Sequence, residues 1–141
     1  DSSQISGSKL FLALKNNKPH LMNIFGNGLI AQEEVLNHYS QIAGDTINIL
    51  LNNGEITKVI AYQLAKSIYY AKEDNKGYLG INSSESYKLI ASFDSGKIQR
   101  IAFYQKPKST FYPIKDLNNS NKFLSNFVWK KALRPKSKDD L

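Results

Sequence analysis

The sequence predicts an all-β fold assembled from repeated β-hairpins. The segment 96–112, GKIQRIAFYQKPKSTFY, aligns without a gap with 54–70, GEITKVIAYQLAKSIYY, and 4–25 aligns in the same way with 41–62. Within each copy, apolar residues recur at every second position, which is the spacing of a β-strand with one apolar face. Helical spacing is scarce, and we interpret 29–38 as the end of a strand followed by a loop.

Each copy contains two apolar stretches that are separated by a turn sequence. The turns contain Asn16-Asn17, Asn53-Gly54 and Ser95-Gly96. Residues of this kind accept the positive φ angles that a tight hairpin requires. A polar insertion in 71–80 lengthens the connection between the second and third copies, at the tip where a hairpin tolerates extra residues. The sequence therefore predicts three hairpins in tandem.

One face of these hairpins is apolar in all three copies, whereas the other face is mixed. The apolar face supplies our candidate lining residues for a trough, although a closed barrel and a half-open sheet both fit the pattern. The same face also suits the core of an ordinary sandwich. The candidates are Leu10, Leu12, Leu14, Met22, Ile24, Ile47, Ile49, Leu51, Val59, Ala61, Leu89, Phe93, Ile101 and Phe103.

The character of the chain changes near residue 115, so we predict a β-domain over 1–114 and a C-terminal region over 115–141. The C-terminal region is rich in Asn and carries apolar residues at near-helical spacing. A short helix, or an extended arm that packs Phe123, Phe127 and Trp129 on the sheet, fits this pattern. After Pro135 we expect a basic, disordered tail.

Composition narrows the chemistry. The 141 residues include no cysteine, which excludes thiolate metal sites, cysteine nucleophiles and disulfides. His20 and His38 stand outside any metal-ligand or catalytic spacing, and no nucleophile has a recognisable base. We therefore expect no enzymatic activity, no catalytic residues, no metal and no cofactor. The net charge of +7 favours an anionic partner, and no apolar run approaches the length of a membrane-spanning helix.

The arrangement resembles the OstA-like, LptA-type domain of lipopolysaccharide transport, in the version found in long OstA-like proteins of Bacteroidetes-type bacteria. The resemblance rests on QIAGDTINILLNNGEITKVIAY, AKSIYYAKEDNKGYLGINSSES, GKIQRIAFYQKPKSTFYPI and FVWKKALRPKSKDD. It implies a half-open β-jellyroll with a V-shaped interior that accommodates lipid. It further implies a periplasmic location with outer-membrane association, and edge-to-edge stacking with other domains of this type.

The first copy departs from this family pattern. Lys18-Pro19 replaces the turn Gly-Glu or Gly-Lys of the other copies, and Gly26 and Gly28 stand in the return strand. The departures predict an irregular first hairpin or an end cap.

The resulting functional expectation is a non-enzymatic bridge domain that holds the acyl chains of lipopolysaccharide or a lipid A-type lipid. Moving about twelve methylenes from a membrane into water costs on the order of 10 kcal/mol, so a carrier needs continuous apolar surface. Lys66, Lys106 and Lys108 are candidates for contact with the headgroup, although exposed lysines also protect sheet edges.

Two other functions fit the residues. One is a scaffold whose interior is filled by its own side chains. The other is a basic β-domain that binds nucleic acid; we do not expect that partner, because Tyr62/Tyr104 and Tyr70/Tyr112 recur as packing residues would.

Overall fold

The protein is an all-β molecule organised around one antiparallel sheet. The computed structural model describes residues 3–35 and 37–129. Its eight strands follow the order β1-β3-β4-β5-β6-β7, with β2 also paired to β3 and β8 also paired to β6. The strands are β1 (Ser3–Ser6), β2 (Lys9–Lys15), β3 (Lys18–Val35), β4 (His38–Asn52), β5 (Glu55–Glu73), β6 (Gly77–Asp94), β7 (Lys97–Tyr104) and β8 (Lys108–Pro113), followed by the 3₁₀ turn η1 (Ile114–Asp116).

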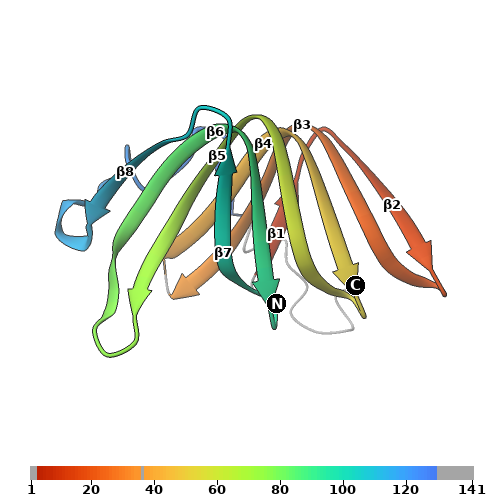
Figure 1. Ribbon diagram of the computed structural model, residues 1–141, viewed down its shortest axis with the longest axis horizontal. Coiled ribbons are helices and arrows are strands. Elements are labelled where there is room, and N and C mark those ends of the chain that lie inside the picture. Colours follow the sequence, from red (N-terminus) through yellow and green to blue (C-terminus); the bar gives the residue numbers. More distant parts are fainter. Residues whose placement is uncertain (1–2, 36, 130–141) are drawn as a thin grey trace.

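The long strands bend over a common ridge, so that the sheet folds into two limbs (Figure 1). The first limb contains β2, β7 and the segments 18–25, 46–52, 55–62 and 88–94 of the long strands. The second limb contains β1, β8 and the segments 28–35, 38–43, 65–73 and 77–86. The sheet does not close on itself, which agrees with the predicted half-open jellyroll.

The bend is produced by the same backbone device in each copy of the repeat. Residues 26–27, 63–64 and 105–106 all have positive φ angles. In β3 and β5 the pairing register shifts at these positions. The extra, unpaired residues at these shifts are β-bulges, and they turn the strand through the ridge. Positive φ is rare for residues other than glycine, so its recurrence at these positions marks a specific bend. The glycine at position 26 is therefore part of a bend that the other copies build with glutamine. The expected irregularity of the first hairpin is wrong at this position.

The predicted hairpin turns are present. In Asn16-Asn17, Asn53-Gly54 and Ser95-Gly96 both turn residues have positive φ. This is the backbone of the type I′ turn, whose twist matches that of paired strands. Asn17 takes the place that glycine holds in the other two turns. The expected replacement of the turn by Lys18-Pro19 is therefore wrong by one residue, because Lys18 pairs with Lys15 and is equivalent to Glu55 and Lys97.

Residues 29–35 continue β3, so the strand extends further than the strand end and following loop that were expected over 29–38. Leu29, Ile30 and Ala31 are all buried, because β3 is covered on both faces in the second limb. A strand buried on both faces loses the alternation of apolar and polar residues. The sequence pattern therefore concealed this half of the strand.

The C-terminal region forms an extended arm over the outer face of the second limb, and residues 117–129 do not form the alternative helix. Gln41, almost completely buried, donates a hydrogen bond from Nε2 to the carbonyl oxygen of Lys122 (2.9 Å). Its Oε1 accepts one from the amide of Leu124 (2.8 Å). The ring of Tyr39 contacts Phe127 and Trp129, with centroids 5.2 and 4.8 Å apart. The predicted tail after Pro135 lies outside the described residues.

Candidate functional site

Two rows of apolar side chains cross the inner face of the first limb, and we call them the apolar rows. Direct cross-strand pairing links the members of each row from β2 to β7. One row is Leu10, Ile24, Ile47, Ala61, Leu89 and Phe103, and the other is Leu12, Met22, Ile49, Val59, Ala91 and Ile101. Directly paired residues in an antiparallel sheet lie on the same face, so each apolar row is continuous across six strands.

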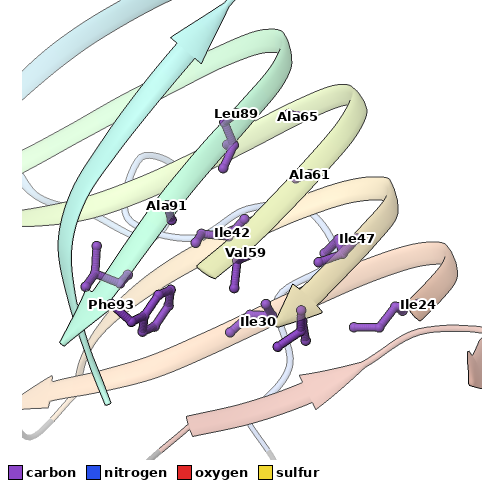
Figure 2. Close-up of a cluster of buried hydrophobic side chains, with 12 residues drawn as sticks. Ile24, Ile30, Ile42, Ile47, Val59, Ala61, Ala65, Leu89, Ala91 and Phe93 are labelled. Atoms are coloured by element: carbon purple, nitrogen blue, oxygen red, sulfur yellow. The ribbon is translucent and has the colours of Figure 1, made fainter. Parts of the chain in front are cut away.

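The structure brings most of the predicted lining residues into one cluster (Figure 2). Ile24, Ile47, Ile49, Val59, Ala61, Leu89 and Phe93 are buried in it, and Met22, Leu51, Ile101 and Phe103 are partly buried against it. Ile30, Ile42 and Ala65 join this cluster from the second limb. The centre of the interior is therefore filled by the protein's own side chains, and the apolar rows are accessible to solvent or a ligand only towards their ends.

The three remaining lining residues lie on β2 and are exposed. Leu10, Leu12 and Leu14 have exposed fractions of 49, 52 and 59%. Leu10 and Leu12 face the same side as the core because they pair with Ile24 and Met22. They are exposed because β2 is the last strand of the first limb. At the opposite end of the same rows, Ile101 and Phe103 on β7 are only partly buried.

A polar contact joins the two limbs at the far end from the ridge. The side chain of Gln32, in the second limb, donates from Nε2 to the carbonyl oxygen of Gly96, in the turn between β6 and β7. Gln32 is itself 3% exposed. The limbs are thus held together below the filled centre.

The predicted headgroup lysines do not lie beside the apolar rows. Lys66 and Lys108 both pair with Glu85. Their neighbours in sequence, Ala65, Ser67 and Ser109, point into the interior, so the three charged side chains lie on the outer face of the second limb. Lys106 lies at the bend between β7 and β8. Adjacent residues of a strand point to opposite faces. The alternation along β5 and β8 therefore already placed Lys66 and Lys108 on the face opposite the apolar rows, and the prediction did not take it into account.

Lys106 and Lys108 instead line a hollow of about 660 Å³ at the ridge. The half-exposed ring of Tyr87 and the exposed side chain of Leu64 are also part of its wall. Glu85 contributes a carboxylate, so the hollow is not uniformly cationic.

The outer face of the first limb carries a cation, Lys88, between two aromatic rings, and a second aromatic contact on β2 and β3. The ammonium of Lys88 lies 5.5 Å from the ring centroid of Tyr62 and 5.9 Å from that of Tyr104. The rings of Phe11 and Phe25 meet edge to face, with centroids 5.7 Å apart. These contacts are made within the protein and stabilise the sheet surface. They also account for the recurrence of Tyr62 and Tyr104 in the repeat.

Polar residues line part of the interior, and the sequence reasoning did not identify them. The inner row of the second limb reads Ile5, Ile30, Ile42, Ser67, Ser84 and Ser109 across β1, β3, β4, β5, β6 and β8. It changes from isoleucine to serine halfway across the sheet. The repeat contained a signal for this change, because Ser67 and Ser109 align between the second and third copies.

Within the described ranges 3–35 and 37–129, no group of three or more metal-ligating side chains could hold a metal ion. In the same ranges, no helix has the length and apolar character needed to cross a membrane. Burial raises the pKa of Tyr69 above its ordinary value, and the nearby carboxylate of Glu34 raises it further. Tyr69 is therefore a neutral phenol at physiological pH.

Comparison of the chain with protein-family models and with curated proteins gave no match.

Proposed function

We propose that this protein is a non-enzymatic bridge domain that stacks with like domains and offers acyl chains an apolar surface. The observation that carries the proposal is that both apolar rows end at unpaired edges of the sheet, where their side chains are exposed on β2 and only partly buried on β7. Leu10 and Leu12 end the rows on β2, and Phe103 and Ile101 end them on β7. Exposed apolar side chains in register with a core are unfavourable in an isolated domain unless a ligand or partner covers them.

The edges match one another in a way that supports stacking. One end of the sheet presents β2 and β1, and the other end presents β7 and β8. If β7 of one molecule pairs with β2 of the next, β8 lies beside β1, and both limbs continue. Unpaired strand edges recruit further strands through backbone hydrogen bonds. A head-to-tail contact of this kind generates a chain of domains.

In such a chain, the apolar rows of successive domains would join. The family resemblance suggests lipopolysaccharide or a lipid A-type lipid as the ligand, and the periplasm as the location. In a single domain the filled centre confines acyl contact to the row ends. The positions for acyl chains in our proposal are therefore the β2 and β7 ends.

Photo-crosslinking along one apolar row tests the lipid-binding part. A leucine-sized diazirine amino acid is placed at Leu12, at Ile101 or at Ile49, and the protein is irradiated with purified lipopolysaccharide. We expect adducts from Leu12 and Ile101 but none from Ile49, which is completely buried. The absence of adducts at both row ends would contradict acyl binding.

A scaffold function remains the second candidate, and the filled centre favours it. Ile47, Ile49, Val59 and Ala61 have no exposed surface, as in an ordinary sandwich core. Under this function the edges would still associate, but no position would form a lipid adduct. Sedimentation of the wild type and of Leu12→Lys, which places a charge on the edge, measures association independently of lipid.

A further inference from the structure

An open cleft lies between the two limbs beside the β7–β8 edge, and we call it the serine cleft. Its volume is about 390 Å³, within the range of small-molecule sites. One wall belongs to the first limb and is apolar, and the other wall belongs to the second limb and is polar. The lining residues are Ile101 and Phe103 on the first wall, with Ser67, Tyr69, Asn82, Ser84 and Ser109 on the second.

The cleft exists because serine replaces isoleucine in the inner row of the second limb. Where this row is Ile5, Ile30 and Ile42, the side chains contribute to or pack against the filled core. Where it is Ser67, Ser84 and Ser109, the shorter side chains leave space opposite Ile101 and Phe103. Large side chains on one limb thus face small hydroxyls on the other.

The hydroxyls of this wall are not all satisfied by one another. Ser84 Oγ and Ser109 Oγ share a hydrogen bond of 2.7 Å. Ser67 is 1% exposed, and its Oγ has no hydrogen-bond partner in the protein. A buried hydroxyl without a partner is unfavourable. Its position on the cleft wall points to a ligand that carries a hydrogen-bonding oxygen.

We propose that the serine cleft binds an acyl chain where the chain carries an oxygen, as an ester or amide carbonyl or a hydroxyl. The methylenes lie against Ile101 and Phe103, and the oxygen of the ligand accepts a hydrogen bond from Ser67 Oγ. The inference rests on the proposed function and deepens it, because it adds selectivity for oxygen-bearing chains. A purely apolar groove would bind a chain with or without such an oxygen.

Binding of two matched probes tests this selectivity. Methyl decanoate and undecane have similar chain lengths, but only the ester carries oxygens. Each probe is titrated into ¹⁵N-labelled full-length protein, and amide shifts of Ser67, Ser84 and Ser109 report on occupancy. We expect the ester to bind about five- to tenfold more tightly than the alkane, as one additional hydrogen bond would give.

The variant Ser67→Ala removes the unpartnered hydroxyl while leaving the apolar wall intact. We expect the variant to bind the ester and the alkane with about equal affinity, and its affinity for the alkane to equal that of the wild type. Folding is not at risk, because the hydroxyl makes no hydrogen bond within the protein, and the thermal midpoint should stay the same or rise. The control Ser92→Ala alters a serine on the outer face, between Lys58 and Arg100 in register, and should keep the wild-type preference.

The possible outcomes separate this inference from the proposed function. Equal binding of both probes to the wild type, or an unchanged preference in Ser67→Ala, would overturn the oxygen contact. If crosslinking from Leu12 persisted in that case, the bridge function would stand without it. If neither probe shifted the cleft amides and neither row end formed a lipid adduct, both proposals would fall.

Discussion

Replacing Leu12 with alanine tests whether the leucines of β2 serve folding or await a partner. Leu12 and Ile49 belong to the same apolar row, with Met22 between them in register. Leu12 is 52% exposed, whereas Ile49 has no exposed surface. The pair therefore compares two apolar side chains on one face that differ in what covers them.

The expected losses of stability follow from this difference in exposure. Full burial of a leucine side chain stabilises a fold by about 1.5–3 kcal/mol, and Leu12 realises only about half of its burial. Because alanine keeps the Cβ, Leu12→Ala should lower the free energy of unfolding by about 0.5–1 kcal/mol. Ile49→Ala removes fully packed atoms and leaves a cavity, so it should cost about 2–5 kcal/mol.

Urea-induced unfolding, followed by circular dichroism, measures both free energies. The titrations belong at low protein concentration, so that association through β2 does not add to the apparent stability. A loss at Leu12 of about 2 kcal/mol or more, close to that at Ile49, would refute the reasoning. It would mean that the β2 leucines are covered within the single domain.

Three further predictions concern the ridge, the arm and the tyrosines. Leu64 is 73% exposed and has a positive φ, so Leu64→Gly should not destabilise the fold, whereas Leu64→Val should, because a β-branched residue tolerates this backbone less well than leucine. Thermal unfolding compares the two variants, and equal midpoints would argue against strain at the ridge. Gln41→Leu deprives Lys122 and Leu124 of their hydrogen bonds, so limited proteolysis should cleave the arm faster than in wild type; unchanged cleavage would show that the aromatic contacts suffice. Burial raises the pKa of Tyr70 in the folded protein. The stability that the buried neutral phenol contributes is therefore complete below the ordinary tyrosine pKa of about 10, and it is lost as the pH rises through the raised pKa. Unfolding titrations at neutral and strongly alkaline pH should show this loss, and Tyr70→Phe, if it folds, should show less of it.

The sequence determined the local structure because strands and turns depend on neighbouring residues. Alternating Ile47, Ile49 and Leu51 specified a strand with an apolar face, and Asn53-Gly54 specified the hairpin turn. The repeat then placed equivalent residues on the same face of successive hairpins. The predictions for these elements are confirmed, since the cross-strand pairs align them in continuous rows.

The bends at the ridge show where local reasoning stopped. Gln63 and Leu64 adopt positive φ although neither residue favours it. The conformation is imposed by the fold, because both limbs must pack against each other across the interior. The alignment of the repeats already paired Gly26 with Gln63, but only the three-dimensional structure shows that both residues build the same bend.

Sequence alone therefore determined which side chains share a face, and the tertiary structure decided what covers each face. Leu12 and Ile49 follow the same pattern, but one lies at an edge and the other beneath the opposite limb. Lys66 and Ser67 are neighbours in sequence, yet one points outward and the other towards the serine cleft. The physical reason is that alternation is a property of one strand, whereas burial depends on atoms that distant segments bring to the other side.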